Sequence, residues 1–328
     1  MDILSSLEEQ RTGDGNKIQN KNAVFAVLNF LRKKQTRPVA LRFVRTVQRD
    51  FFLPQFQGKF KIRKRPVVWV DHPLDQRIPF RPQHVAIYLT FTHLWIKSIH
   101  FIYREFGRRT IPSIVSFVND LTELYSESAL VYRRVQSTTN RPHHYGGFYF
   151  KVIHLFDPHL HCIPSLHVGV VGLTYLTISK LIDEFAENPA EYAAEKEYLW
   201  QRTVLITESI LFIKQHSVNC VAAGLYTLSS HRYAFSRKDS HHVIDALFTG
   251  EGNRLENSEV LREYIRDLYE HFMKQRELLE RRAETKRGAS EGFRDEDQRK
   301  ALMENRTYLG ARKKPRTPAE TSARVLVD

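Results

Sequence analysis

Apolar residues recur at helical spacing along most of the chain, and this pattern predicts a largely helical protein. Between Asn22 and Lys34 they fall on one face of a helix. The same periodicity predicts helices over residues 83–105, 112–134, 165–186, 190–230 and 256–285, the fourth with a break near residue 200. Because strands do not alternate with helices and no repeat is visible, we expect an all-α fold, a bundle of about six core helices, rather than a doubly wound sheet.

Prolines divide the N-terminal part from this helical core. They stand at positions 38, 54, 66, 73, 79 and 82, which predicts that residues 37–82 do not form a continuous helix, although RPVVWV suits a short strand. After about Arg287 the chain turns polar and predicts a loosely ordered tail. We therefore expect a basic N-terminal region (1–82) packing on a helical core (83–250), followed by an amphipathic helix and the tail (251–328).

The apolar segments are poor candidates for lipid-exposed spans. The best, residues 84–103, carries His93, Lys97 and His100, and a lysine near a helix centre costs about 2.5 to 3.5 kcal/mol on insertion scales. These segments predict buried helices with ionisable groups facing an interior site. A polytopic membrane protein with a polar cavity is the alternative, since such groups could line it.

Charge and cysteine content narrow the class of protein. The 328 residues carry a formal charge of +13, and residues 32–65 hold twelve Lys or Arg against one acid, Asp50, interleaved with phenylalanines. This composition suits an anionic membrane surface, or else a solvated face whose aromatic residues enter the core. The two cysteines form no disulfide framework, and the N-terminus lacks a signal-peptide pattern. We expect a membrane-associated or cytoplasmic protein, and no nucleic-acid partner because no nucleic-acid-binding signature is visible.

Three short segments combine groups suited to phosphate chemistry. Arg134 and Arg141 are separated by six residues, and guanidinium groups bind phosphate oxygens in a planar fork. In PSLH, Ser165 and the first backbone amides of a helix would face one anion, with His167 at its edge as a general acid. The alternative is an ordinary helix cap and a core histidine.

The third segment, SILFIKQHSVNC, places Lys214 two residues before His216 within an apolar helix. A buried ammonium requires an anion nearby, and a neighbouring imidazole can attack phosphorus while the lysine neutralises the phosphoryl oxygens. A salt bridge between Lys214 and Glu208 is the structural alternative.

Together these segments resemble the type 2 phosphatidic acid phosphatase superfamily, which includes the vanadium haloperoxidases and bacterial acid phosphatases. The family pattern is a Lys or Arg, six residues, Arg-Pro; then Pro-Ser-x-His; then Ser-Arg, five residues, His, three residues, Asp. Its counterparts here are Arg134 to Pro142, Pro164 to His167 and Ser209 to His216. The similarity covers residues 130–225 and is closest to the subgroup of the inositol phosphorylceramide synthases.

The resemblance implies a helical bundle with the site between helices, and a reaction without metal or cofactor. It implies that His216 is the nucleophile that forms a phosphohistidine and that His167 protonates the leaving alcohol. It further implies phosphate binding by Arg134, Arg141 and Ser165, with the Leu166 amide in place of a glycine amide. The expected substrate is a phosphate ester of a lipid, and the expected activity is that of a metal-independent phosphatase or phosphotransferase.

Two positions depart from the family pattern. Ile210 replaces an arginine, for which Lys214, one turn later, is a substitute. Cys220 replaces the aspartate that would orient the nucleophilic histidine; Asn219, Glu208 or Asp245 are alternative acceptors for the His216 proton. A catalytically impaired protein that binds a phosphate or lipid therefore remains an alternative, as does a basic protein that binds nucleic acid or a membrane surface. A zinc site of Asp157, His159, His161 and Cys162 is a weaker alternative, because no second ligand pair follows.

Overall fold

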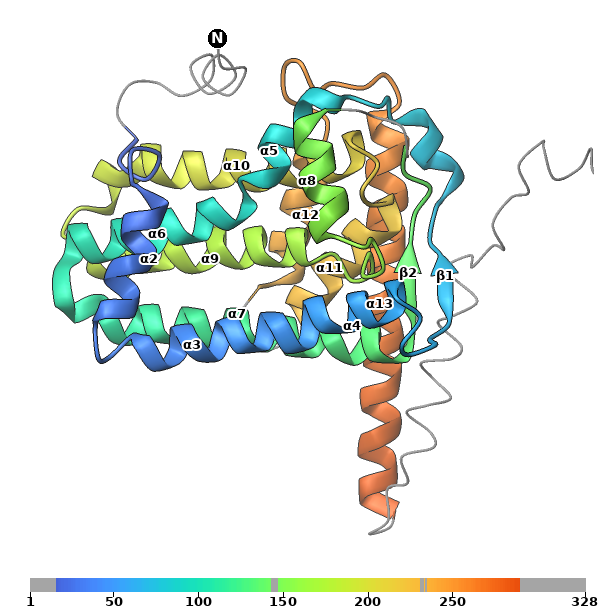
Figure 1. Cartoon of the computed structure of the whole chain (residues 1–328), viewed down its shortest axis with the longest axis horizontal. Helices are drawn as coiled ribbons and strands as arrows, with labels where there is room; N and C mark the ends of the chain where they lie inside the picture. The colour runs from blue at the N-terminus through green and yellow to red at the C-terminus, as the bar shows by residue number, and fades with distance from the viewer. Residues whose placement is uncertain (1–15, 143–146, 231–232, 234, 290–328) are drawn as a thin grey trace, which may run out of the picture.

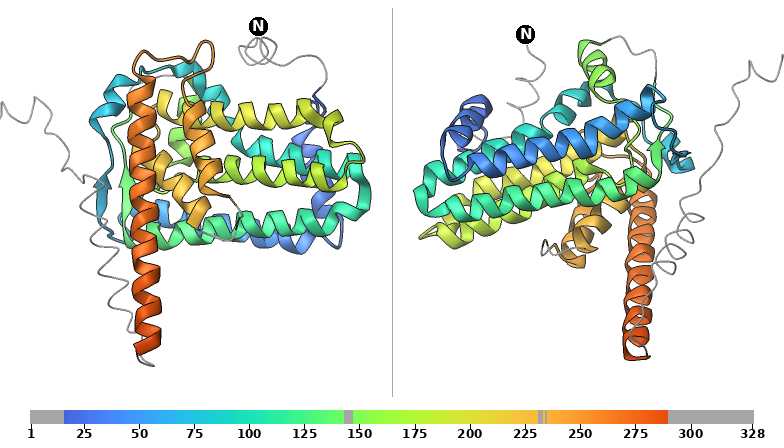
Figure 2. Two further views of the ribbon diagram at one scale, coloured as in Figure 1. Left: turned by 180° about the vertical axis from the view of Figure 1, so that it is seen from behind. Right: turned by 60° about the horizontal axis from the view of Figure 1, so that its bottom comes forward.

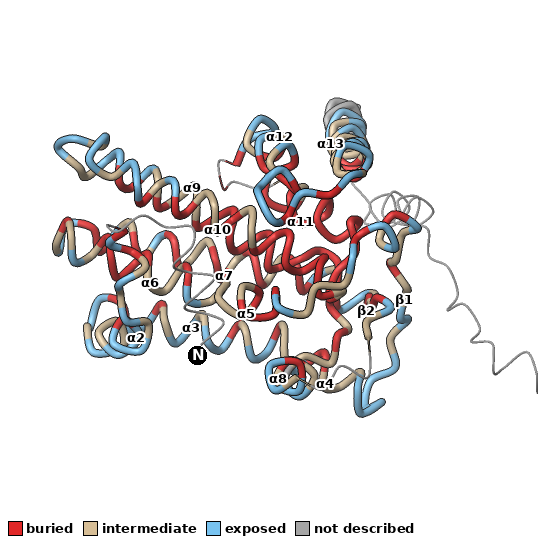
Figure 3. The backbone as a smooth tube through the Cα atoms, turned by 90° about the horizontal axis from the view of Figure 1, so that it is seen from above, coloured by how far each residue is buried: buried red, intermediate tan, exposed pale blue. Residues whose placement is uncertain are grey.

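Helix α9 (Leu166–Phe185) lies in the middle of the bundle, and its first nine residues are all buried (Figure 1, Figure 3). The sequence LHVGVVGLT is apolar or small almost throughout, as expected of a helix enclosed by others. Helix α11 (Val218–Ser230) approaches it closely, since a Cβ atom at Gly224 would lie 3.0 Å from the backbone oxygen of Ser165. The start of α9 is therefore held against α11.

The computed structural model describes residues 16–142, 147–230, 233 and 235–289 and confirms the all-α helical bundle. Helices α6 (Phe91–Phe106), α7 (Ile111–Arg134), α10 (Ala193–Phe212) and α11 pack on α9. The predicted helices over 112–134 and 165–186 are α7 and α9. The short turn η4 (Gly107–Thr110) joins α6 to α7, and η5 (Pro189–Tyr192) precedes α10.

The N-terminal region is more helical than its prolines predict. After α2 (Ala23–Arg32), one helical run includes α3 (Arg37–Thr46), the π-helical turn η1 (Val47–Phe52) and α4 (Leu53–Lys59). A proline in a regular helix clashes with the carbonyl four residues earlier. The wider π turn, in which the Leu53 amide donates to the Gln48 carbonyl, immediately precedes Pro54. The chain therefore reaches this proline from a turn that is not regular α-helix. Residues 37–82 do not form one continuous helix, as predicted, but the helical run over 37–59 extends past two of its prolines.

A small parallel sheet joins segments that are distant along the chain. Strand β1 (Val67–Trp69), the strand expected from RPVVWV, pairs with β2 (Gln136–Thr138). An isolated bridge links Ser137 to His161, and the Ile163 amide donates to the Ser137 hydroxyl at 2.8 Å. These contacts position the segment before α9 beside the segment that carries Arg141.

The remaining elements cover the two sides of the bundle. The turns η2 (Pro73–Arg77) and η3 (Pro82–His84) lead into α5 (Val85–Leu89), and α8 (Phe148–Phe156) lies on the same side as α2, α3 and α4 (Figure 3). Helices α12 (Arg237–Ala246) and α13 (Ser258–Ala289) lie on the opposite side (Figure 2, Figure 3).

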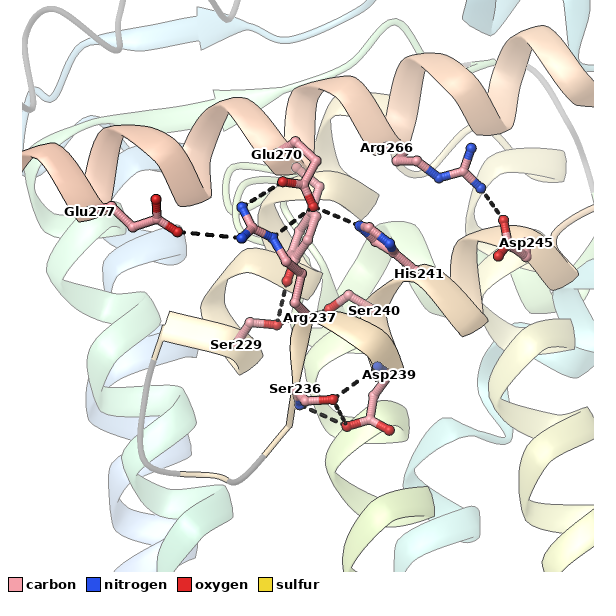
Figure 4. A network of polar contacts seen from close by, with 11 residues as sticks. Ser229, Ser236, Arg237, Asp239, Ser240, His241, Asp245, Arg266, Glu270 and Glu277 are labelled. Carbon is pink, nitrogen blue, oxygen red and sulfur yellow. Dashed lines mark hydrogen bonds and ion pairs between the residues drawn. The ribbon is translucent and has the colours of Figure 1, made fainter.

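Helix α13 is amphipathic, as predicted for residues 256–285. Its first half buries a stripe against α11 that consists of Leu261, Ile265, Leu268, Tyr269 and Phe272. Ion pairs also connect it to α12: Glu270 accepts from both Arg237 and His241, and Arg266 pairs with Asp245 (Figure 4). Exposed pairs of this kind contribute about 0 to 1 kcal/mol each, so the apolar stripe dominates the docking.

Two helical stretches of the described chain are long and apolar enough to cross a membrane, Pro82–Arg134 and α9. The apolar window of α9 is 72% buried inside the bundle, as in a core helix. The longer stretch combines several helices and turns back at η4 (Figure 1). Length and composition alone are weak evidence for a span.

Candidate functional site

Two imidazoles that are 49 positions apart along the chain meet inside the bundle. His167 lies in the first turn of α9 and His216 between α10 and α11, with ring centroids 5.3 Å apart and planes at 70°. Both side chains are buried, at 9% and 8% exposure. His167 is also in contact with the rings of Tyr88 and Phe91, each at 4.4 Å. The predicted convergence of the two histidines is present.

The histidines line a cavity of about 190 Å³. Its outer wall consists of half-buried aromatic side chains from α3, η1 and α6, namely Phe43, Phe51, Phe52, Phe91 and Trp95. Its inner wall includes Asp157, His159, His161 and Cys162 from the segment before α9. An apolar, aromatic passage thus ends on a polar group of imidazoles.

A backbone carbonyl orients His216. Its Nδ1 lies 3.1 Å from the Cys162 oxygen. A carbonyl can only accept a hydrogen bond, so this contact assigns the proton to Nδ1 and leaves the lone pair on Nε2. The ring is fixed in the tautomer that a nucleophilic Nε2 requires.

The helix expected over 190–230 is broken at 213–217 instead of near residue 200. The amides of Gln215 and His216 both donate to the Ile210 carbonyl, at 3.0 and 3.1 Å, and Lys214 adopts a left-handed φ of 59°. The Lys214 ammonium donates to the carbonyl oxygens of Asp75, at 2.5 Å, and Ile78. Because His216 precedes α11, it does not share a helix face with the residues three and four positions later.

Asn219 and Cys220 therefore do not orient His216, and that prediction is wrong. The Asn219 amide donates to the Val70 carbonyl at 3.0 Å and accepts from the Tyr264 hydroxyl at 2.7 Å. The Cys220 sulfur accepts from the Ser217 amide at 3.3 Å. The other two acceptors considered are engaged elsewhere as well: Glu208 accepts from the Phe248 amide and Asn253, and Asp245 pairs with Arg266.

Lys214 holds a turn of the backbone instead of the cavity. Its two carbonyl partners belong to η2 and the residue after it, and Lys214 is not among the cavity-lining residues. Burial lowers the pKa of Lys214, while Asp75 and Asp71 raise it. Neither the predicted phosphate contact nor a salt bridge to Glu208 is formed.

The two arginines of the first segment differ in position. Arg141 donates to the Gln215 side chain at 3.1 Å and to the Asp157 carbonyl at 3.5 Å, so it lies between a cavity-lining residue and the neighbour of His216. Burial lowers the pKa of Arg141, and the nearby Asp157 raises it. Arg134 is exposed at the end of α7, and its side chain has no hydrogen bond or ion pair within the described residues. Of the two arginines, Arg141 lies beside the site, although neither arginine is among the residues that line the cavity.

Ser165 and Leu166 begin α9 as expected. The Ser165 hydroxyl caps the helix by accepting from the Val168 amide at 3.5 Å, and Leu166 lines the cavity. The buried Tyr132 hydroxyl donates to the Pro164 carbonyl at 2.6 Å and fixes the entry to the helix. The first turn of α9 therefore begins at the cavity, which Leu166 and His167 line.

Both central histidines are neutral in the free protein. Burial lowers the pKa of His216 to about 4, against the opposing effect of its hydrogen bond to the Cys162 carbonyl. Burial together with His216 lowers the pKa of His167 well below its usual value. A bound phosphate anion would raise both pKa values, because an opposite charge favours the imidazolium.

The residues considered for zinc lie together but are not arranged as ligands. His161 stacks on Tyr132 at 4.1 Å, and neither of its nitrogens has a hydrogen-bond partner among the residues that the structure describes. His159 Nε2 lies 2.7 Å from the Thr139 hydroxyl. Among the residues that the structure describes, no group of three or more His, Cys, Asp or Glu side chains could hold a metal ion.

Comparison with protein-family models, with curated proteins and with solved structures finds no match for this chain. The site is therefore interpreted from its own geometry.

Sequence reasoning missed several residues of this site. The Cys162 carbonyl, Gln215 and the aromatic wall carry no motif signal, since a backbone oxygen can belong to any residue. The histidine-rich DPHLHC beside PSLH is the one local signal that would have indicated the inner wall.

Buried neutral histidines predict a protein that loses stability in mild acid. The folded pKa values are about 4 for His216 and His84 and about 3 for His161, below the unfolded value of 6.5. The unfolded state therefore binds more protons, so this stability is complete above pH 6.5 and is lost as the pH falls toward 4. Each histidine contributes up to about 1.4 kcal/mol per pH unit.

Urea unfolding between about pH 7 and pH 5 measures this slope. His161→Phe keeps a ring beside Tyr132 but removes one titrating group, so its slope is expected to be shallower. A free energy of unfolding that stays constant over this range would contradict the neutral, buried state of these histidines.

Cys220→Asp is expected to destabilise the protein without improving any reaction. The side chain is fully buried, and the nearby Asp75 and Asp71 carboxylates already raise the pKa of the Cys220 thiol after burial itself. A third carboxylate there would be desolvated among like charges, at a cost of about 3 kcal/mol or more. Chemical denaturation measures this loss in the free energy of unfolding, with Cys220→Ser as the control. A gain in turnover at unchanged stability would show that residue 220 does reach His216.

Proposed function

We propose that the protein is a metal-independent phosphatase or phosphotransferase that acts on a phosphate ester through a phosphohistidine at His216. The observation that carries the proposal is the pair of buried imidazoles 5.3 Å apart, with the Nδ1 of His216 held by a carbonyl. This arrangement offers one nitrogen lone pair for attack and a second imidazole for proton transfer.

In the proposed first step, His216 Nε2 attacks phosphorus and the bond from phosphorus to the ester oxygen breaks. The departing alkoxide takes a proton from the His167 imidazolium, whose pKa the bound phosphate has raised. In the second step, neutral His167 takes a proton from water or from an acceptor alcohol, whose oxygen attacks phosphorus. The nitrogen–phosphorus bond then breaks and His216 returns to its starting state.

Charge on the phosphoryl oxygens would be balanced by Arg141 and the start of α9. Arg141 is held beside the cavity by Gln215 and Asp157. The amides of the first helical turn add partial positive charge at Leu166. Such donors usually contribute a factor of about 10² to 10³ in rate each.

The resemblance to the type 2 phosphatidic acid phosphatase superfamily supports this assignment of roles. Three of its motif positions, Arg141, Ser165 and His167, lie in or beside the site with His216, and the fold is an all-α bundle. The Cys162 carbonyl supplies the orienting acceptor that Cys220 cannot. Membership in the family is part of the proposal.

The aromatic outer wall favours a substrate with an apolar portion. A phosphate at the imidazoles would direct its ester group outward past Phe51, Phe91 and Trp95. Such side chains bury hydrocarbon well, so we propose a lipid phosphate.

Hydrolysis of p-nitrophenyl phosphate and of a short-chain phosphatidic acid in excess chelator tests the proposal. We expect chelator-resistant turnover that vanadate inhibits. Activity that appears only with an added divalent cation would contradict it.

A second candidate is a protein that binds a phosphate or lipid without turnover. The exposed Arg134 and the engaged Lys214 favour it, because fewer cations remain near the phosphate than the sequence predicts. Saturable binding of the short-chain phosphatidic acid with no hydrolysis would select this candidate.

A further inference from the structure

One face of the molecule exposes large apolar side chains on four separate segments. Figure 3 shows α2, α3, α4 and α8 along the same side, with α13 on the other. The exposed residues include Val24, Phe25, Val27 and Leu28 of α2, Leu41 and Val44 of α3, and Phe148 and Leu155 of α8, at 39% to 74% exposure. We call the exposed side of these segments, continued through residues 60–64 after α4, the basic apolar face.

Positive charge is interspersed with these apolar residues. Ten Lys or Arg side chains between residues 32 and 64 are exposed. In the run KFKIRK, residues 59–64, all six side chains are exposed. The one acid between residues 23 and 64, Asp50 of η1, is 1% exposed and pairs with Arg49 and Arg133, so it contributes no negative charge at this surface.

The less buried wall of the cavity lies toward this face. It comes from α3, η1 and the start of α6, whereas the histidines are buried deeper. Helix α2 packs on both α3 and α6. A ligand that enters past the outer aromatic residues therefore approaches from the basic apolar face.

We propose that the basic apolar face docks on the surface of an anionic bilayer, with its apolar side chains at the boundary of headgroups and acyl chains. Lysine and arginine beside exposed apolar residues is the pattern by which peripheral proteins bind such surfaces, and scattered exposed apolar residues alone would not select it. The docked orientation turns the cavity toward the lipid. The docking does not depend on the proposed function. Delivery of a lipid phosphate to His216 by the docked protein rests on the proposed function.

Flotation of the full chain with vesicles tests the docking without any turnover. The vesicles are phosphatidylcholine alone, or phosphatidylcholine with about 30% phosphatidylserine, at about 0.1 M and about 1 M salt. We expect binding to the anionic vesicles that weakens in high salt, and little binding to the neutral ones.

Two variants on the face and two matched variants on α13 locate the contact. The double variant Val24→Ser with Leu28→Ser should weaken binding to anionic vesicles roughly tenfold or more. The double variant Lys61→Glu with Lys64→Glu should weaken it at least about 25-fold, since each lysine contributes about fivefold. The controls are Val260→Ser with Leu278→Ser and Lys274→Glu with Arg282→Glu, all exposed on α13.

The proposal fails if the face variants bind like the α13 controls, or if neutral and anionic vesicles bind equally. Self-association that Val24→Ser with Leu28→Ser abolishes, without vesicle binding, would overturn it in favour of a contact between two copies of the chain. Vesicle binding by a protein with no phosphatase activity would retain the docking and reject the proposed function.

Discussion

Replacing His216 with alanine is expected to lower turnover by about 10⁴-fold or more, because in the proposed reaction His216 Nε2 forms the bond to phosphorus. Within the described residues the side chain makes one hydrogen bond, to the Cys162 carbonyl, so we expect its loss to leave the surrounding helices in place. Steady-state hydrolysis of p-nitrophenyl phosphate measures the effect. The thermal midpoint of unfolding, measured in parallel, separates it from loss of the fold.

His161→Gln is the matched control for this variant. It removes another buried imidazole from the same cavity, but one whose nitrogens make no hydrogen bond. We expect a loss of activity below about tenfold, since this side chain takes no part in the proton or phosphoryl transfer. Equal losses in the two variants, or substantial activity in His216→Ala, would rule out His216 as the nucleophile.

The arginine pair gives the second large effect. Arg141→Met should lower kcat/KM by about 10² to 10³-fold, because it removes the guanidinium that the proposed function places at the phosphate. Arg134→Met should change kcat/KM by less than about threefold, because that side chain is exposed and, within the described residues, is not hydrogen-bonded to any residue beside the cavity. The two residues belong to the same sequence motif, so the sequence alone predicts similar losses.

Steady-state kinetics of both variants, with vanadate inhibition constants, distinguishes the two expectations. Vanadate should bind more weakly to Arg141→Met and equally well to Arg134→Met. A large loss in Arg134→Met would mean that this side chain turns inward when substrate binds, contrary to its exposed position.

Elements with strong local periodicity were predictable. The bounds of α7 and α9 agree with the predicted ranges to within about one residue, because apolar spacing, a proline near one start and a serine cap at the other are local properties. The helical run over residues 37–59 could not be predicted, because the π turn that precedes Pro54 has no signature in the amino-acid composition. The break at 213–217 was also missed, because it contains neither glycine nor proline and is stabilised by distant carbonyls at Asp75 and Ile78.

The residues of the site likewise divide into those that the local sequence indicates and those that depend on tertiary contacts. His167, His216 and Arg141 were identified from the order of residue types, and the small sheet and α11 bring their segments together. The role assigned to Cys220 depended on a continuous helix, so the break removed it. Lys214 was expected to face an anion and instead binds backbone oxygens, a partner that no sequence pattern reveals.

Fold and site are linked by a few tertiary contacts. Ser137 binds the Ile163 amide, Tyr132 binds the Pro164 carbonyl, and the Cys162 carbonyl binds His216. The segment immediately before α9 is thus fixed from three directions, and it positions both imidazoles. A rigid support of this kind is what an aligned nucleophile and acid require.

A crystal structure with bound vanadate would test the central claim most directly. The account predicts vanadium bonded to His216 Nε2, His167 beside the apical oxygen opposite it, and Arg141 with the amides at the start of α9 on the equatorial oxygens. Vanadate bound elsewhere, or a complex in which the two imidazoles point away from it, would contradict the account.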